Sequence, residues 1–171
     1  MVHALKLADP AGLHAAASPE AFREVMRELA SGVALATGQF EGRRAGCAVT
    51  SLASLSLAPA SLLVCLNCES STLRCIRASG AFAVNVLADR HEALARRFAG
   101  AGDERFAAGE WGALATGAPV LRDALAVIDC RLERVVEHAT HVILIGAAVA
   151  VAGGAGGGAL LHWRSRFETI A

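Results

Sequence analysis

Three consecutive hydroxyl side chains, Ser70, Ser71 and Thr72, stand just before a short helical pattern over residues 72–79, which ends at Gly80. The first N–H groups of a helix have no partner within the helix, and neighbouring hydroxyls add donors, so a phosphate group could bind there. The same residues also suit an ordinary helix N-cap, in which a serine oxygen accepts a hydrogen bond from the backbone. The sequence leaves both interpretations open.

A second group of hydroxyls, Thr50, Ser51, Ser54 and Ser56, interrupts an otherwise apolar segment. Hydroxyls that become buried need hydrogen-bonding partners, which backbone groups, water or a polar ligand could supply. The two hydroxyl segments are only about 20 residues apart. One ligand could therefore contact both, with a phosphate at one segment and a ring system at the other.

Among the histidines, His141 is the strongest candidate for a functional role because it begins a long apolar segment, although a single histidine is more often structural. His138, His162 and His91 are weaker candidates. The sequence contains no H-E-x-x-H metal motif, no recognisable Ser/His/Asp arrangement and neither of the two common glycine-rich nucleotide motifs. The sequence therefore indicates no protein nucleophile.

The five cysteines, an odd number, indicate reduced thiols and a cytoplasmic location, because the N-terminus shows no secretory signal. The Cys65-x-x-Cys68 spacing raises the possibility of zinc or redox chemistry. A zinc site needs two further ligands, and only Cys75 lies nearby. Packing of small apolar thiols is the alternative, and we expect no metal site.

Composition predicts one globular domain over residues 18–171, preceded by a flexible arm over 1–17 that has little pattern. Apolar residues make up 54% of the 171 residues, and the formal net charge is zero. Basic residues are dispersed, so we expect no nucleic-acid partner. The longest apolar segments are interrupted by glycines before they could cross a bilayer, so we expect no membrane span.

The hydrophobic periodicity predicts many strands and three helices that do not alternate regularly, which indicates an antiparallel barrel with helices at its rim. In the strand over 126–136, alternation places Asp129, Arg131 and Glu133 on a solvated face. The strands over 61–67 and 141–151 look buried on both faces. The other expected strands cover 32–38, 81–87 and 160–167, with an extended region over 45–59. The expected helices run from Pro19 to about Gly32, over 72–79 and from Asp89 through Phe98. The segments 100–118 and 152–159 are expected to be loops.

From about residue 19 to 168 the chain resembles the flavin reductase-like family, the small reductase components of two-component flavin-dependent monooxygenases. "AGCAVTSLASLSLAP" is similar to the flavin-binding segment G-x-T-A-S-S-F-x-S-V-S-L-x-P. "LLVCLNCESSTLRCIRASGAFAVNVL" is similar to the strand, phosphate turn, helix and strand that follow it. "FREVMRELASGVALAT" precedes them, and "GAPVLRDALAVIDCRL" and "HATHVILIGAAV" come after, all in the family's order.

The resemblance implies a mainly β fold, an antiparallel split β-barrel with a few peripheral helices, usually a homodimer with flavin near the subunit interface. It places His141 beside the nicotinamide and makes Arg164 and Arg166 the basic residues of the closing segment. The expected flavin contacts are Thr50, Ser51, Leu52 and Ser54 along the ring and ribityl chain, and Asn67, Ser70, Ser71 and Thr72 at the phosphate.

The implied activity is an NAD(P)H:flavin oxidoreductase that passes hydride from NADH or NADPH to FMN or FAD and supplies reduced flavin to a partner monooxygenase. The alternative is a flavin-binding sensor or storage protein of the same fold without reductase activity. The chain departs from the family pattern at Ala48, Thr140 and Ala147, and it contains no tyrosine. These departures leave the choice of flavin and of nicotinamide cofactor open.

Overall fold

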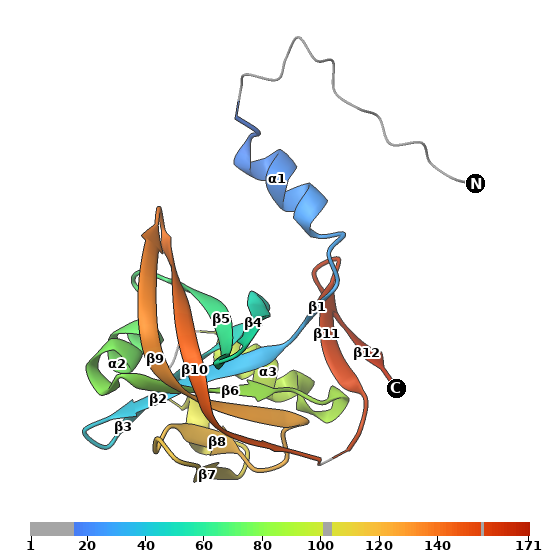
Figure 1. Cartoon of the computed structure of the whole chain (residues 1–171). Coiled ribbons are helices and arrows are strands. Elements are labelled where there is room, and N and C mark those ends of the chain that lie inside the picture. The colour runs from blue at the N-terminus through green and yellow to red at the C-terminus, as the bar shows by residue number, and fades with distance from the viewer. Residues whose placement is uncertain (1–15, 101–103, 155) are drawn as a thin grey trace.

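A seven-stranded antiparallel sheet, in the order β3-β2-β6-β9-β10-β5-β4, forms the body of the protein (Figure 1). The computed structural model describes residues 16–100, 104–154 and 156–171, so nearly all of the arm expected over 1–17 lies outside the described residues. Two smaller antiparallel sheets, β1-β11-β12 and β7-β8, complete the described strands. Together these sheets confirm the mainly β, antiparallel fold.

The elements have the following bounds. The helices are α1 (Pro19–Met26), α2 (Ser71–Ser79) and α3 (Glu92–Ala99), with short 3₁₀ turns η2 (Asp89–His91) and η3 (Arg105–Ala107). The strands are β1 (Ser31–Gly32), β2 (Ala34–Phe40), β3 (Arg43–Val49), β4 (Leu52–Leu57), β5 (Ala60–Asn67), β6 (Ala81–Val86), β7 (Trp111–Ala113), β8 (Pro119–Leu121), β9 (Ala126–His138), β10 (His141–Gly153), β11 (Ala159–Trp163) and β12 (Arg166–Ile170).

The connection between β3 and β4 forces the large sheet to curl. These strands lie at opposite ends of the strand order, so in a flat sheet they would be separated by about 29 Å. Only Thr50 and Ser51 join them, and a connection of that length reaches roughly 11 Å from Val49 to Leu52. The two sheet edges must therefore lie near each other, and because they do not pair, the result is a split barrel.

Two apolar clusters occupy the two faces of the central strands. One cluster packs beneath α2 and includes Ile76 and Phe82, both fully buried. The other packs beneath α3 and includes Phe98. The strand β2 contributes to both, with Ala36 in the first cluster and Leu35 in the second. Both helices are thereby fixed firmly against the sheet.

The helix α2 forms where the sequence predicts it. The Ser70 side chain accepts a hydrogen bond from the Thr72 N–H at 3.1 Å, and Gly80 ends the helix with a left-handed φ of 67°. The helix α1 ends at Met26, earlier than the predicted end near Gly32, and none of its residues is buried. In Figure 1 α1 projects away from the barrel. Among the described residues no helix is both long and apolar enough to cross a bilayer.

The prediction that Asp129 faces solvent is wrong. Asp129 is fully buried, and its carboxylate accepts hydrogen bonds from the backbone N–H and the hydroxyl of Thr116. Asp129 shares its face of β9 with Val127, which belongs to the apolar cluster beneath α3, so this face is covered here and not open to solvent. Arg131 and Glu133 do face solvent.

The strands predicted to be buried on both faces, 61–67 and 141–151, are buried on only one face in the single chain. Their second face carries half-buried apolar side chains. The predicted strand over 160–167 is instead a hairpin of β11 and β12, because Arg164 and Ser165 adopt left-handed φ values of 48° and 61°. The region over 100–118, expected to be a loop, contains η3 and β7 in its described part.

The barrel interior has no room for a side chain at Gly146. A Cβ there would lie 2.5 Å from the Phe82 Cζ atom and 2.9 Å from the Cys130 Cβ atom. We predict that Gly146→Ala lowers the free energy of unfolding by about 1–3 kcal/mol, because both neighbours are buried and cannot move aside cheaply. Urea denaturation monitored by circular dichroism measures this. The matched control is Gly32→Ala, whose Cβ would have no neighbour within 4 Å. Equal stability of the two variants would contradict the packing argument.

Candidate functional site

Ser51 of the first hydroxyl segment contacts β5, the strand that leads into the second segment at the N-terminus of α2. The Ser51 hydroxyl donates to the Cys65 carbonyl at 3.1 Å, and the Cys65 N–H donates to the Ser51 carbonyl at the same distance. Further along β3, the Cys47 thiol lies beside the side chains of Ser70 and Thr72. The ends of β3 and β5 and the start of α2 therefore form one site.

The three hydroxyl side chains at the start of α2 have different environments. Ser70 is the N-cap, which confirms the ordinary capping interpretation for this residue. The Ser71 side chain is exposed and lines a cavity. The Thr72 hydroxyl is fully buried and makes no hydrogen bond of normal geometry within the described residues. A buried hydroxyl without a partner is costly, so Thr72 is suited to a ligand that supplies an acceptor.

Asn67 shapes the turn that leads into α2. Its side-chain oxygen accepts a hydrogen bond from the Glu69 N–H at 2.8 Å, and its backbone carbonyl accepts from the Ser70 N–H at 3.1 Å. Both bonds hold the turn in a shape that presents the first N–H groups of α2 outward. Asn67 thus positions the predicted phosphate site through the backbone.

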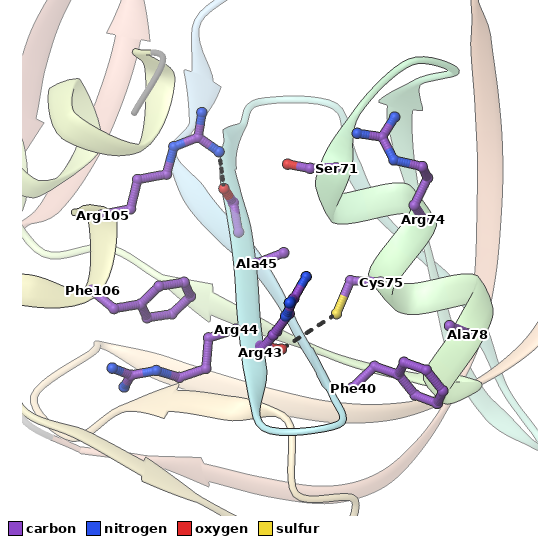
Figure 2. A pocket seen from close by; sticks show the side chains of 11 residues that line it. Phe40, Arg43, Arg44, Ala45, Ser71, Arg74, Cys75, Ala78, Arg105 and Phe106 are labelled. Carbon is purple, nitrogen blue, oxygen red and sulfur yellow. Dashed lines mark hydrogen bonds between the residues drawn. The ribbon is translucent and has the colours of Figure 1, made fainter. Parts of the chain in front are cut away.

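A cavity of about 480 Å³, which we call the arginine pocket, opens beside this helix end (Figure 2). The strand β3 forms its floor, α2 forms one wall, and η3 forms the other. None of the residues that line it is acidic. They are Phe40, Arg43, Arg44, Ala45, Gly46, Ser71, Arg74, Cys75, Ala78, Arg105 and Phe106.

Arg105 brings a positive charge to the site from a distant part of the sequence. Its guanidinium donates to the Gly46 carbonyl at 2.7 Å and to the Gly100 carbonyl, while its buried Nε–H has no partner in the described residues. Gly46 also lets the Phe98 ring pack closely against β3, because a Cβ there would lie 2.7 Å from that ring. Sequence analysis missed Arg105, since no local motif links it to the hydroxyl segments.

The thiol of Cys47 does not compete with an anion for this site. Burial raises its pKa, and the neighbouring polar side chains of Thr72 and Ser70 and the charge of Arg105 only partly oppose that effect. Burial likewise raises the pKa of Cys75. Both thiols therefore stay neutral at neutral pH and leave the positive potential of the site intact.

The remaining predicted ring contacts line two smaller cavities. Thr50 and Leu52 line a cavity of about 280 Å³ together with Ser31 and Gly32 of β1, which the sequence analysis did not single out. Leu52 and Ser54 line a mostly apolar cavity of about 260 Å³ at the β4 edge. Thr50 thus lines the cavity beside β1, whereas the neighbouring Ser51 contacts Cys65 of β5.

His141 lies next to the predicted phosphate turn. It pairs with Asn67 of β5 across the sheet and with His138 of β9 on its other side. Directly paired residues share a face of the sheet, so the side chains of His141 and Asn67 project from the same face. The His141 ring is exposed, with Nδ1 2.9 Å from the hydroxyl of Thr140. The ring is free to approach a ligand bound at this edge.

Arg164 and Arg166 are not brought to this site within one chain. In Figure 1 the β11–β12 hairpin and α2 lie on opposite sides of the molecule. The Arg164 guanidinium contacts the Glu28 carboxylate at 2.7–3.1 Å and stacks on Trp163, and the Glu28 contact raises the pKa of Arg164. Arg166 lies 3.7 Å from the Glu168 carboxylate. Arg164 thus ties the C-terminal hairpin to the segment after α1.

The Cys65-x-x-Cys68 pair lies at the end of β5, where Cys65 is half-buried and Cys68 is exposed. All five cysteines are free thiols. In the three described ranges, no group of three or more His, Cys, Asp or Glu side chains is arranged to hold a metal ion.

Comparison with known proteins agrees with this geometry. The family profile described as "Flavin reductase like domain" matches residues 26–171. The FMN reductase (NADH) RutF 2 of Methylorubrum extorquens strain PA1 is 46% identical over 157 residues, which cover 91% of each chain.

Solved structures share the whole fold. Nitrilotriacetate monooxygenase component B from Mycobacterium thermoresistibile superposes with a TM-score of 0.85 at 30% identity, covering 89% of this chain and 86% of that one. The Streptomyces globisporus NADH:FAD oxidoreductase SgcE6, in complex with NAD and FAD fragments, has a TM-score of 0.84 at 26% identity and 98% coverage of both chains. The fold, the sequence motifs and these matches together show that the chain belongs to the flavin reductase-like family.

Proposed function

We propose that this protein is an NADH-dependent flavin reductase that supplies reduced flavin to a partner monooxygenase. The observation that carries the proposal is the pairing of Ser51 with Cys65 on the strand that leads into α2, together with Cys47 of β3 and Arg105 beside the start of this helix. Its relatives support the donor and the acceptor, since one is named an FMN reductase (NADH). A second similar protein is a component of a monooxygenase, which supports the partner.

The phosphate of the flavin would bind at the start of α2. The helix N-terminus attracts a dianion, the Ser71 hydroxyl is exposed there, and the buried Thr72 hydroxyl lacks a partner. The Arg105 guanidinium adds a fixed positive charge nearby.

The ring of the flavin would extend from this phosphate toward Thr50 and Ser51. Bound flavin and NADH themselves supply the hydride-transfer chemistry, so the protein needs no nucleophile. Thr50 and Ser51 would hold the ring edge, with Leu52 providing an apolar contact. His141 would position the nicotinamide, because it is exposed on the strand next to Asn67. These residues act by orienting the two rings against each other.

We further propose that the protein is a homodimer whose interface covers the outer face of β5, β9 and β10. Most side chains on this face are apolar yet only half-buried or exposed in the single chain; Arg134, the direct partner of Ile145, shares the face, and His141 and Asn67 lie at its end. The apolar side chains are Leu63, Cys65, Val136, Ile143 and Ile145. An apolar face of this kind next to a ligand site is typical of an interface. A second copy would also bury it without leaving the site open to bulk water.

The helix α1 supports the same proposal. Its apolar side chains Phe22 and Val25 are 61% and 71% exposed, and Leu29 beyond it is 58% exposed. The spacing of these three residues places them on one face of a helix. A second chain would supply the surface that this face lacks. The five free thiols support a reducing, cytoplasmic location.

We predict that Ser71→Asp weakens FMN binding by roughly 10–100-fold, because a carboxylate would occupy the phosphate position and repel the dianion. Quenching of flavin fluorescence measures the affinity. Riboflavin provides the matched control, since it has the same ring without the phosphate, and its affinity should change less than about twofold. An equal loss for both flavins would contradict the phosphate assignment.

We predict that His141→Ala lowers NADH-dependent turnover by about tenfold while FMN affinity stays within about twofold, because His141 orients the nicotinamide and not the flavin. Steady-state assays at saturating FMN measure the rate. His138→Ala is the control, since His138 is the cross-strand neighbour of His141. A wild-type rate in the His141 variant would remove this residue from the site. If the wild-type protein oxidises no NADH in this assay, that result would favour the sensor or storage alternative.

We predict that Ile145→Lys converts the dimer to a monomer, because a lysine in the middle of the interface would bury an unpaired charge. Light scattering coupled to size-exclusion chromatography measures the mass. Gln39→Lys, a change at an exposed site on β2, should leave the dimer intact. A monomeric wild-type protein, or a dimeric Ile145 variant, would refute this interface.

A further inference from the structure

The arginine pocket is larger than a single phosphate requires. Its volume of about 480 Å³ falls within the range of sites for whole small molecules. Ser71, where the flavin phosphate is proposed to bind, lies at one end of the pocket (Figure 2). The pocket then continues along one face of α2, past Arg74 and Cys75 to Ala78. A ligand with its phosphate at Ser71 could therefore extend into it.

The charge in the pocket exceeds what one phosphate needs. Four arginines line it, Arg43, Arg44, Arg74 and Arg105. Arg74 also donates to the Glu69 carbonyl at 2.7 Å, and Arg105 donates to the Gly46 and Gly100 carbonyls. In the part of the chain that the structure describes, none of the four forms an ion pair with a carboxylate. Arginines of this kind bind phosphate groups through paired hydrogen bonds. The pocket thus suits a ligand that carries a second phosphate next to the first.

The far end of the pocket offers flat apolar surfaces. The Phe40 ring is 41% exposed, and the Phe106 ring lies across the pocket from it (Figure 2). The Arg44 guanidinium stacks over Phe106, with its central carbon 4.7 Å from the ring centroid. Aromatic rings and stacked guanidinium planes are the surfaces on which nucleotide bases pack.

We propose that the arginine pocket binds the adenosine diphosphate part of a dinucleotide, with the second phosphate at Arg43 and Arg74 and the adenine between Phe40 and Phe106. The proposal deepens the proposed function and rests on it, because it takes the first phosphate to lie at Ser71. Both FAD and NADH contain this group. Because the flavin phosphate already occupies Ser71, the ADP group is that of FAD, and the pocket would determine the preference for FAD over FMN.

The test uses ADP itself as the probe, measured by isothermal titration calorimetry on the intact protein. We expect ADP to bind the wild type, and the double variant Arg43→Gln/Arg44→Gln to bind it about tenfold or more weakly. The control Arg131→Gln removes an exposed arginine of β9 that is outside the pocket and should leave ADP affinity unchanged. Circular dichroism verifies that both variants are folded.

Two further measurements on the double variant identify the source of the ADP group. A loss of FAD affinity with FMN affinity held within about twofold assigns the pocket to FAD. A raised KM for NADH with both flavin affinities unchanged would contradict this assignment, because it would place the ADP group of NADH in the pocket without the flavin phosphate. The proposal is overturned if ADP does not bind the wild type at millimolar concentration, or if the double variant binds ADP as tightly as the wild type. It is also overturned if FMN and ADP affinities fall equally. Failure of the proposed function would be recognised separately, because the wild type would then show no NADH-dependent reduction of FMN, whether or not it binds ADP.

Discussion

The two-residue connection between β3 and β4 is the constraint on which the rest of the structure depends. Because Thr50 and Ser51 must join opposite edges of a seven-stranded sheet, the sheet curls until those edges are neighbours. The curl places Ser51 against Cys65 and Cys47 against Thr72. One short connection therefore both closes the barrel and brings Ser51 to the strand that leads into α2.

The site combines a rigid frame with groups left free for ligands. Ile76 and Leu73 anchor α2 in the core, so its N-terminus points in a fixed direction. The Ser70 side chain caps α2, whereas the side chains of Ser71 and Thr72 do not. Such preorganisation lets a bound flavin gain hydrogen bonds without first ordering the protein. The half-buried outer face of β5 and β10 adjoins this site, so the same second subunit that covers the face would shield the ligand from water.

Much of the fold could be predicted from the sequence because the deciding signals are local. Ser70 and Gly80 mark the ends of α2, and the motif order indicates the family. Asp129 shows where local reasoning fails, since its face of β9 is covered by residues from other segments, including Thr116 and the apolar cluster beneath α3. Arg164 was expected at the site because of its place in a motif, yet its pairing with Glu28 depends on the path of the chain after α1. Arg105 reaches the site only through tertiary packing, which the sequence does not encode as a motif.

The central claim is that the flavin phosphate binds at the N-terminus of α2. A crystal structure of the protein grown with excess FMN tests it most directly. The account predicts density for a phosphate within hydrogen-bonding distance of the Ser71 and Thr72 side chains and the first amides of α2, with the ring reaching toward Thr50. A flavin bound with its phosphate elsewhere, or a helix end filled by protein side chains, would contradict it.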